Sequence, residues 1–215
     1  MTAPAYTATA NAPRRALLVI DVQNEYFTGN MRIAYPPVST SLPNIVQAMH
    51  AARDAGVPLI VVQHDAPADS PVFAIGSDAW QLHPQVAAFA PEHKINKVMS
   101  SVFAGSDLRA WLAQRNIDTL AIVGYMTHNC DAATINHAAH DGLEVEFLSD
   151  ATGALPYENA AGKASAEEIH RVYSTVFHSN FAAVASTADW VAAVQEGKPL
   201  HKDNVYLSHQ RARNY

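Results

Sequence analysis

The sequence predicts an α/β protein with three layers: a mostly parallel central sheet, of the Rossmann type, between two layers of helices. Short runs of β-branched and aliphatic residues alternate with longer stretches of helical periodicity, as in strand–helix–strand units. These runs are almost wholly apolar, as expected of strands that helices cover on both faces. The length of 215 residues, with 49% hydrophobic and 16% charged residues, suits one globular domain.

The first elements follow from apolar runs and helix signals. Residues 16–20 (Ala-Leu-Leu-Val-Ile) form the first expected strand. A helix over 41–55 is indicated by Pro43 in its first turn and by Gly56 just past its end. The almost continuous apolar run 57–63 is the second expected strand.

The central elements alternate in the same way. Lys97 lies in a short extended segment ahead of a helix expected over 105–116, for which Ser106 is a plausible cap. The run 119–124 is a further buried strand, and a helix is expected to begin near Cys130 and to end at Gly142.

The last third of the chain continues the alternation. Residues 143–148 are the next expected strand. Ser165 and Glu168 have the spacing of a capping box, which opens a helix running toward Phe177. The last strand and helix are expected over 181–185 and 187–195.

This alternation defines one domain over residues 14–196. Residues 1–13 are expected to be a flexible N-terminus, and 197–215 a tail with little periodicity. Such a tail cannot form a core alone, so we expect it to be an arm that crosses to a neighbour in a homodimer or homotetramer. The segments 28–40 and 65–91 are long loops rich in Pro, Gly and aromatic residues, as functional loops often are.

Composition limits the partners and the location. The net charge of −6 and the pI near 6.0 argue against nucleic-acid binding. A single cysteine excludes an internal disulfide and fits a reducing compartment. No apolar run approaches the roughly 20 residues of a membrane helix, and the N-terminus lacks the apolar core of a secretory signal. We therefore expect a cytoplasmic protein that binds a small-molecule substrate, with no nucleic acid and no membrane as partner.

Three reactive residues fall at expected carboxyl ends of strands, where parallel α/β sheets bind ligands. Asp21 follows the first strand, Lys97 closes a short extended segment, and Cys130 opens a helix after a turn. A helix N-terminus and a nearby ammonium lower the pKa of a thiol, and a carboxylate can accept its proton. The spacing is therefore compatible with a cysteine nucleophile, which we would then expect as a partly exposed thiolate.

Each of these residues also has an ordinary structural explanation. A lone cysteine is more often a small buried hydrophobe. An Asp after a strand is frequently a turn or cap residue, and a Lys is usually solvated. Spacing alone leaves both interpretations open.

The surrounding motifs resemble the isochorismatase-like cysteine hydrolases. They are Leu-Leu-Val-Ile-Asp-Val-Gln-Asn at 17–24, Lys97 ahead of Ser-Val-Phe at 101–103, and Gly-Tyr-Met-Thr-His-Asn-Cys at 124–130. The resemblance covers about residues 16–190, with the elements in the family's order. It implies the isochorismatase-like fold, with Cys130 as nucleophile, Asp21 as proton shuttle and Lys97 as cationic partner.

The same resemblance implies a cis peptide between Tyr125 and Met126. The backbone N–H groups of Met126 and Cys130 would then form an oxyanion hole. Cys130 would attack a carbonyl carbon, release an amine and leave a thioester, which water would hydrolyse with Asp21 as base.

The chain departs from the family pattern at two positions. Many relatives have an apolar residue after the cysteine, where this chain has Asp131, and an Asp where it has His137. We interpret Asp131 as a residue of the first helical turn that interacts with the helix dipole.

No cofactor and no metal are expected. The nicotinamidase branch of the family binds a metal through an Asp-x-His pair after the second strand, and the segment 64–69 contains no such pair. His137 and His140 share a helix face, where we expect them to be solvated.

Aromatic residues of the surrounding loops are the expected pocket walls. Phe27, Trp80 and Tyr125 are assigned to substrate binding, and so is His128, in the turn before Cys130. Trp80 can instead pack its loop onto the domain, and His128 can instead be a hydrogen-bonding residue behind the site.

The leading hypothesis is a cysteine-dependent hydrolase that cleaves a C–N bond of a small amide-type substrate. One alternative is a vinyl-ether hydrolase of the isochorismatase kind, and another is a non-catalytic binding or scaffolding protein on the same fold. Arg32 is the only arginine of the two long loops, so a dianionic substrate would lack a clamp.

Overall fold

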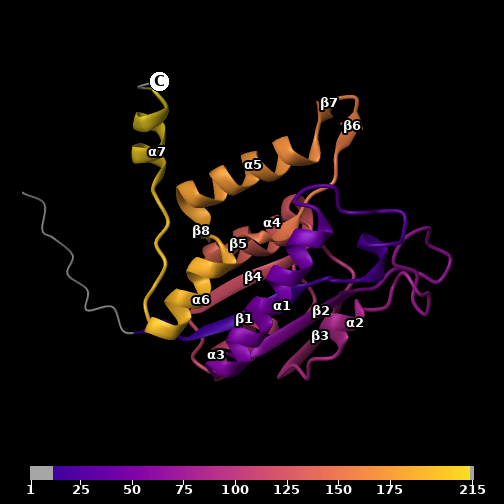
Figure 1. The fold of residues 1–215 in the computed structure, drawn as a ribbon, viewed down its shortest axis with the longest axis horizontal. Coiled ribbons are helices and arrows are strands. Elements are labelled where there is room, and N and C mark those ends of the chain that lie inside the picture. The colour runs from indigo at the N-terminus through magenta and orange to yellow at the C-terminus, as the bar shows by residue number, and fades with distance from the viewer. Residues whose placement is uncertain (1–11, 214–215) are drawn as a thin grey trace, which may run out of the picture.

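The computed structural model describes residues 12–213, which form a parallel sheet covered by helices on both faces (Figure 1). The sheet has six strands in the order β3-β2-β1-β4-β5-β8, and every pairing is parallel. Its strands are β1 (Arg15–Ile20), β2 (Leu59–His64), β3 (His93–Lys97), β4 (Thr119–Tyr125), β5 (Glu144–Gly153) and β8 (Ala183–Ala185). The α/β class and the parallel sheet predicted from the sequence are confirmed.

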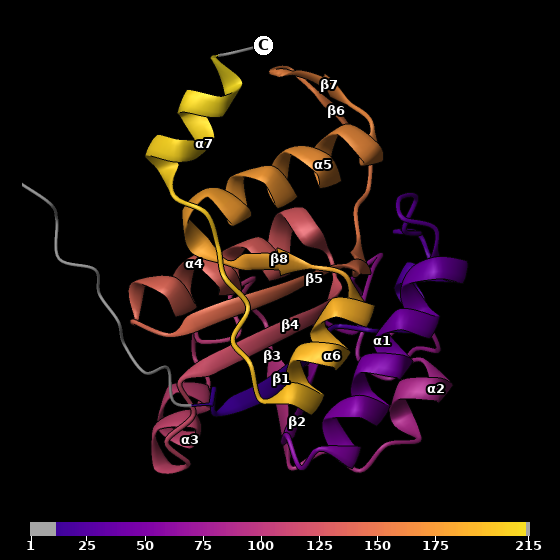
Figure 2. The ribbon, with the colours of Figure 1, turned by 60° about the vertical axis from the view of Figure 1, so that its left-hand side comes forward.

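Two helical layers enclose this sheet (Figure 2). One contains α1 (Val38–Asp54) and α6 (Thr187–Glu196), and its core includes Ile45, Met49 and Trp190. The core of the other face is built with α3 (Leu108–Gln114), α4 (Ala132–His140) and α5 (Ala166–Val176). Both cores use the β1 run, whose residues alternate between the faces: Leu17 and Val19 on one, Leu18 and Ile20 on the other. A strand covered on both faces needs this unbroken apolar sequence.

Several element boundaries differ from the prediction. Helix α1 begins at Val38 rather than at residue 41, because Pro43 near the start removes only one backbone donor. Helix α3 begins at Leu108 rather than at 105, although the Ser106 hydroxyl does accept from the Leu108 N–H, at 3.2 Å. The Ser165–Glu168 capping box of α5 is present as predicted.

Short elements in the loops were not predicted. They comprise the hairpin β6 (Tyr157–Asn159) and β7 (Gly162–Ala164), the helix α2 (Pro84–Ala87) and the single turn η1 (Asn24–Tyr26). Two π-turns, η2 (Thr127–Asp131) and η3 (Phe177–Phe181), precede α4 and β8. The helix predicted to begin at Cys130 is therefore regular only from Ala132.

The centre of the sheet holds a close approach between β1 and β4. Gly124 has φ +111°, and a Cβ there would lie 2.1 Å from the Ile20 carbonyl oxygen. Only glycine fits this position. The contact brings the carboxyl ends of β1 and β4 together, with Asp21 and the turn carrying Cys130 directly beyond them.

The C-terminal tail was expected to be irregular, but residues Val205–Ala212 form α7. The Asn204 side chain caps this helix by accepting from the Leu207 N–H. Residues 198–202 are bound to the body, for example by the Lys202–Glu144 ion pair at 2.6 Å, whereas α7 projects beyond α5 (Figures 1 and 2). None of its described residues is buried.

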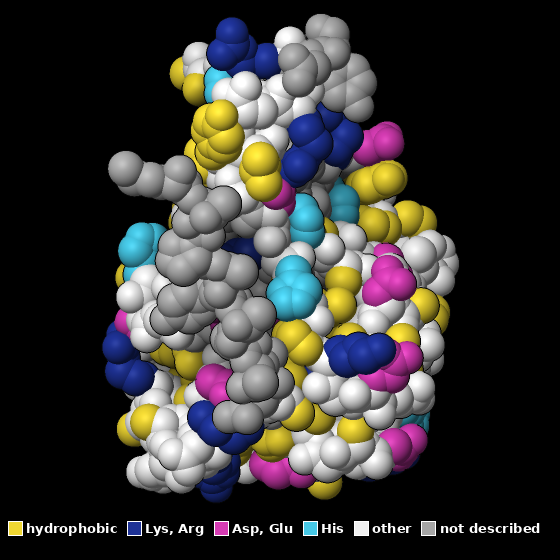
Figure 3. All heavy atoms as spheres, turned by 90° about the vertical axis from the view of Figure 1, so that its left-hand side faces the viewer, with side chains coloured by type: hydrophobic (Ala, Val, Ile, Leu, Met, Phe, Trp, Pro, Cys, Tyr) yellow, Lys and Arg dark blue, Asp and Glu magenta, His cyan; other side chains and the backbone are white. Residues whose placement is uncertain are grey.

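We predict that α7 docks on a second copy of the chain. A helix of this length is marginal in water without packing, and it exposes Val205, Tyr206 and Leu207 beside basic side chains (Figure 3). Residues 204–215 hold two arginines and no acidic residue, whereas the whole chain has a net charge of −6. A basic helix with an apolar face suits the acidic surface of a neighbouring copy.

Truncation after Asp203 tests this prediction while sparing the contacts of residues 198–202. We expect the truncated protein to elute as a smaller species in light-scattering chromatography at micromolar concentration. The matched control is Lys163→Gln on the exposed β6–β7 hairpin, which should leave the oligomer unchanged. An unaltered mass after truncation would refute the docking of α7.

No helix within the described range 12–213 is long and apolar enough to cross a membrane.

Candidate active site

The three predicted reactive residues meet at the carboxyl edge of the sheet. Asp21 follows β1, Lys97 ends β3, and Cys130 lies in the π-turn after β4. The Lys97 Nζ atom is 2.6 Å from Asp21 Oδ2 and 3.2 Å from Cys130 Sγ. All three side chains are buried, with Cys130 only 6% exposed. The sequence therefore identified three residues that the fold places in mutual contact.

The backbone at Asp21 is unusual. Its φ of +50° lies in the left-handed region, which Asp adopts more readily than most non-glycine residues. Its N–H donates to the Val62 carbonyl of β2 at 3.0 Å, which extends the strand pairing by one residue. Left-handed residues are often found at functional sites, and here the conformation carries the carboxylate toward Lys97.

The ammonium of Lys97 has a third partner that the sequence analysis missed. The Nδ1 atom of His64 lies 3.3 Å from Lys97 Nζ. An ammonium has three donors, and Asp21, Cys130 and His64 provide one acceptor each. Because this geometry needs an unprotonated Nδ1, it favours a neutral His64; burial, and then Lys97, lower the pKa of His64. Its position at the carboxyl end of β2, next to β1, is the signal that could have identified it.

Burial sets the proton affinities of the three groups. It raises the pKa of Asp21, although Lys97 opposes the rise. The pKa of Lys97 is raised despite burial, because Asp21 and Cys130 stabilise its charge. Burial and then Asp21 raise the pKa of the Cys130 thiol well above its ordinary value, against the effect of Lys97.

These proton affinities correct one expectation. We expected Cys130 to be a partly exposed thiolate, but its side chain is buried beside the Asp21–Lys97 ion pair, and the raised pKa of the thiol favours the protonated form. The thiol proton therefore has to be removed as the thiol reacts, and Asp21 is the carboxylate in contact with the cluster. The arrangement favours general-base activation over a preformed thiolate.

The turn that carries Cys130 begins with a cis peptide. The Tyr125–Met126 bond is cis, as the resemblance implied. The Met126 carbonyl accepts from the N–H groups of Asn129 and Asp131, at 3.0 and 3.3 Å. These bonds wind the chain tightly below Cys130. The assignment of the Met126 and Cys130 N–H groups to an oxyanion hole stays a prediction.

Asp131 lies at the N-terminus of α4, where we placed it as a helix-dipole residue, but its side chain points into the interior. Its side chain is fully buried and caps no helix. The Thr152 hydroxyl of β5 lies 2.6 Å from Asp131 Oδ2, while Oδ1 has no partner among the described residues. Burial raises the pKa of Asp131 to about 7.

The four predicted pocket residues occupy different environments. The Phe27 ring packs on His83 and Tyr125, with centroids 4.4 and 5.8 Å apart. The Tyr125 ring is fully buried and its hydroxyl pairs with Ser41 at 2.8 Å. We therefore correct its assignment from pocket wall to core residue.

The other two predicted pocket residues, Trp80 and His128, also lie in different environments. The Trp80 indole donates to Asp65 at 2.8 Å, and its carbonyl accepts from Gln23, also at 2.8 Å. These bonds favour the alternative that Trp80 fastens its loop to the domain. His128 lies in the same turn as Cys130, and its ring contacts Tyr157 of β6 at 4.7 Å. Its ring nitrogens are buried and have no partner among the described residues; burial lowers its pKa to about 4.

Two buried polar residues near the site hold the surrounding loops. Gln23 is fully buried and donates to the carbonyls of His64 and Trp80, at 2.9 and 2.8 Å. The Glu25 carboxylate accepts the Met31 N–H at 3.0 Å and the Phe73 N–H at 3.3 Å. Glu25 thus ties the two long loops to each other, and Gln23 ties the loop 65–91 to the end of β2.

A metal site is not formed by the histidines that we considered. Within residues 12–213, no cluster of three or more His, Cys, Asp or Glu side chains has a metal-binding arrangement. His137, expected to be solvated, instead stacks on Phe103 with centroids 4.8 Å apart and contacts Ser101. His140 is exposed and bonds to the Asn136 carbonyl.

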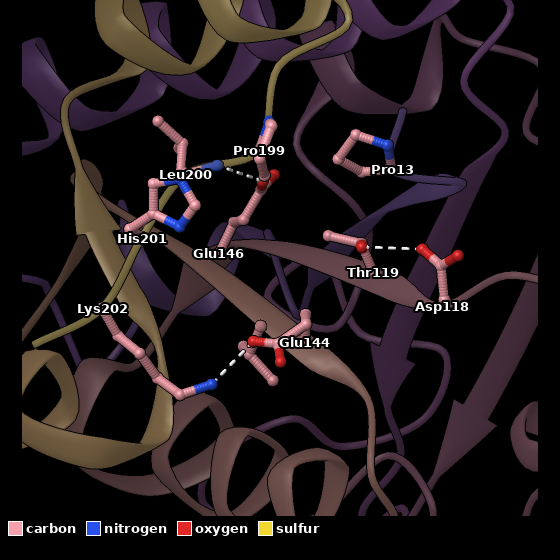
Figure 4. Close-up of a pocket in the computed structure, with 10 residues that line it drawn as sticks. Pro13, Asp118, Thr119, Glu144, Glu146, Pro199, Leu200, His201 and Lys202 are labelled. Atoms are coloured by element: carbon pink, nitrogen blue, oxygen red, sulfur yellow. Dashed lines mark hydrogen bonds and ion pairs between the residues drawn. The ribbon is translucent and has the colours of Figure 1, made fainter. Parts of the chain in front are cut away.

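A cavity of about 430 Å³ lies at the other edge of the sheet (Figure 4). Its wall includes the first residues of β4 and β5, Thr119 and Glu144, and the segment Pro199–Lys202. The three reactive residues do not line it. Ligands of parallel sheets bind at the carboxyl ends of strands, so the candidate site remains at Cys130.

The chain is similar in sequence and in fold to known proteins. The family model described as the isochorismatase domain matches residues 15–189. A crystal structure of a Burkholderia xenovorans LB400 protein assigned to the isochorismatases is 63% identical, with a TM-score of 0.93, and the match covers 94% of this chain and 97% of that one. The secreted isochorismatase effector Isc1 of Verticillium dahliae is 30% identical over 80% of this chain and 92% of its own length. N-carbamoylsarcosine amidase of an Arthrobacter species is 26% identical over 60% of this chain and 56% of its own.

Proposed function

Because the chain belongs to the isochorismatase family and is a hydrolase of that family, we propose that it uses Cys130 to cleave a C–N bond in a small amide-type substrate. The observation that carries this proposal is the contact of one buried ammonium with both a carboxylate and a thiol. Lys97 Nζ lies 2.6 Å from Asp21 Oδ2 and 3.2 Å from Cys130 Sγ. Such a group can generate a thiolate at the moment of attack and stabilise it.

In the first half-reaction, the Cys130 sulfur attacks the substrate's carbonyl carbon while Asp21 takes the thiol proton. The carbonyl oxygen gains negative charge, for which the backbone N–H groups of Met126 and Cys130 are the proposed donors. The tetrahedral intermediate collapses when the C–N bond breaks. Asp21 returns its proton to the leaving nitrogen, so ammonia or an amine departs and a thioester remains on Cys130.

In the second half-reaction, water hydrolyses the thioester. Asp21, again ionised, removes a proton from the attacking water. The C–S bond then breaks, and Asp21 returns its proton to the sulfur, which restores the thiol. Lys97 stays protonated through both halves, because its role is to stabilise the charge that moves between Asp21 and Cys130. His64, neutral and in contact with Lys97, holds the ammonium in place.

The charges around the site support a neutral or weakly charged substrate. Lys97 is committed to Asp21, Cys130 and His64. Arg32, the only arginine of the two long loops, is exposed and donates to the carbonyls of Gly29 and Thr28. A dianion would therefore find no free cation there. N-carbamoylsarcosine amidase, one of the relatives, is by its name an amidase.

A vinyl-ether hydrolase is the second candidate. The relative named an isochorismatase effector favours it, and a protonated carboxyl group is the acid that an enol ether requires. Such a reaction needs no thioester and therefore no sulfur nucleophile. The dependence on Cys130 separates the two functions.

The test is a screen of small amides, lactams and ureido compounds, with isochorismate included and released ammonia or amine as the readout. We expect turnover of at least one amide-type compound and no turnover by Cys130→Ala. Efficient turnover of isochorismate that survives Cys130→Ala would overturn the amidase assignment. A thiol that resists alkylation at every pH, with no turnover of any compound, would favour the scaffold alternative.

A further inference from the structure

A chain of four buried polar groups leads away from the active-site turn. Thr152 Oγ1 is 2.6 Å from Asp131 Oδ2 and 3.0 Å from Thr127 Oγ1. Thr127 Oγ1 is also 3.0 Å from His170 Nδ1. Asp131 and both threonines are fully buried, and His170 is 7% exposed. The chain connects the residue after the nucleophile, through β5 and the start of η2, to α5.

Counting hydrogens shows that one end of this chain carries a proton, either on Asp131 or on His170 Nδ1. It contains three short contacts, and each needs one hydrogen between its two heavy atoms. The two threonine hydroxyls provide only two. The third must come from a carboxylic acid proton on Asp131 or from an N–H at His170 Nδ1.

The contact between His170 and Thr127 allows that proton to move along the chain. The Nδ1 atom of His170 can accept a hydrogen bond from Thr127 or, when it carries a proton, donate one to it. The chain thus has two forms: a neutral acid with Nδ1 as acceptor, or a carboxylate with Nδ1–H as donor.

Two observations favour the neutral form at rest. Asp131 Oδ1 is buried without a partner among the described residues, which costs less for the carbonyl oxygen of an acid than for a carboxylate. Burial also lowers the pKa of His170 and raises that of Asp131 to about 7. The charged groups facing Asp131 are Asp21, which raises its pKa, and Lys97, which lowers it; His128 lies near His170.

We propose that Asp131, Thr152, Thr127 and His170 form a proton wire that keeps Asp131 neutral beside the catalytic group. Asp131 is then a positioning residue, because it acts on Asp21 and Cys130 through its charge and does not touch the substrate. When the acid proton moves from Asp131 to Thr152, the Thr152 proton moves to Thr127 and the Thr127 proton to His170 Nδ1. One O–H bond is lost at Asp131 and one N–H bond forms at His170.

The wire predicts a specific effect on the reaction. A carboxylate at Asp131 adds a second negative charge near Asp21 and disfavours loss of the thiol proton. Above pH 7, kcat/KM of the wild type should therefore fall below that of Asp131→Asn. One pKa unit of coupling corresponds to about tenfold. This effect rests on the proposed function, whereas the proton wire itself does not.

The decisive measurement is NMR of ¹⁵N-histidine-labelled protein between pH 5 and 9, with His170→Gln to assign the ring. We expect the His170 nitrogen shifts of the wild type to change near pH 7. In Asp131→Asn, whose amide supplies the third hydrogen, Nδ1 should remain an acceptor throughout. Thr152→Val should uncouple Asp131 from His170. Adding Asp131→Asn to that variant should then leave its His170 spectrum unchanged, and Thr152→Ser should restore the coupling.

Thr175→Val, an exposed threonine of the same helix α5, is the matched control and should alter neither the spectrum nor kcat/KM. Identical His170 spectra in wild type, Asp131→Asn and Thr152→Val would overturn the wire. So would a Thr152→Val protein that loses activity while its pH profile keeps the wild-type shape, because that result indicates a structural role alone. The NMR result stands whether or not an amide substrate is found.

Discussion

Replacing Cys130 with alanine is expected to lower kcat/KM by at least about 10⁴-fold, the scale of losing a nucleophile from a covalent mechanism. Alanine removes the sulfur that lies 3.2 Å from Lys97 Nζ and leaves the Asp21–Lys97 ion pair in place. Because the substitution deletes one small buried group, the fold should survive. The measurement is steady-state hydrolysis of the best substrate of the screen, with circular dichroism to verify folding.

Two further variants make this prediction specific. Asp21→Asn is expected to lose activity on a similar scale while Cys130 stays in place, because the buried thiol then has no base. Met49→Leu, on the buried face of α1, is the matched control and should retain most of the activity. A Cys130→Ala enzyme with more than a tenth of the wild-type rate would exclude the thioester route.

The substitution Glu146→Ala is expected to destabilise the fold by about 3–5 kcal/mol, the usual cost of removing one partner from a buried ion pair. Glu146 on β5 accepts two hydrogen bonds from Arg15, each 2.8 Å long, and one from the Trp190 indole at 2.8 Å. The side chains of Arg15 and Glu146 are each only 3% exposed. Without Glu146, the guanidinium is left buried without its counter-charge.

Urea unfolding followed by fluorescence measures this loss. The double variant Arg15→Met/Glu146→Met should recover much of the stability, because it removes both charges together. Glu158→Gln, which breaks the exposed Lys163–Glu158 pair, should change stability by less than about 1 kcal/mol. Equal losses from Glu146→Ala and Glu158→Gln would show that burial does not strengthen the first pair.

The elements that could be predicted are those whose residues are set by local rules. Strands β1 and β4 are continuous apolar runs because helices cover both faces of the sheet. The start of α5 is marked in the sequence by its capping box. Helix α7 was missed because its apolar residues are exposed and pack on no other part of the described chain, so they leave no pattern of buried positions. The hairpin β6–β7 has only three residues in each strand, too few for a periodic pattern.

Some features of the site could likewise be predicted from the sequence, and others could not. Asp21 and Cys130 could be predicted, because parallel strands bring their carboxyl ends to one edge and the surrounding motifs are specific. The burial of the thiol and of Asp131 depends on how the turn packs against β5, which no local pattern encodes. Arg15 and Glu146 are 131 residues apart in the chain, and nothing in either neighbourhood indicates that the two charges meet in the interior.

The pairing of β1 with β4 also determines when the protein can become active during its synthesis. Residues 15–20 of β1 pair with residues 119–124 of β4. About a hundred further residues must therefore be synthesised after β1 before β4 can pair with it. Contacts between such distant parts of a chain form slowly. Until the ribosome has released β4, β1 presents an unpaired apolar edge, the kind of surface on which nascent chains aggregate. The strand contact that brings the nucleophile to its base is therefore also one that the chain can complete only late in its synthesis.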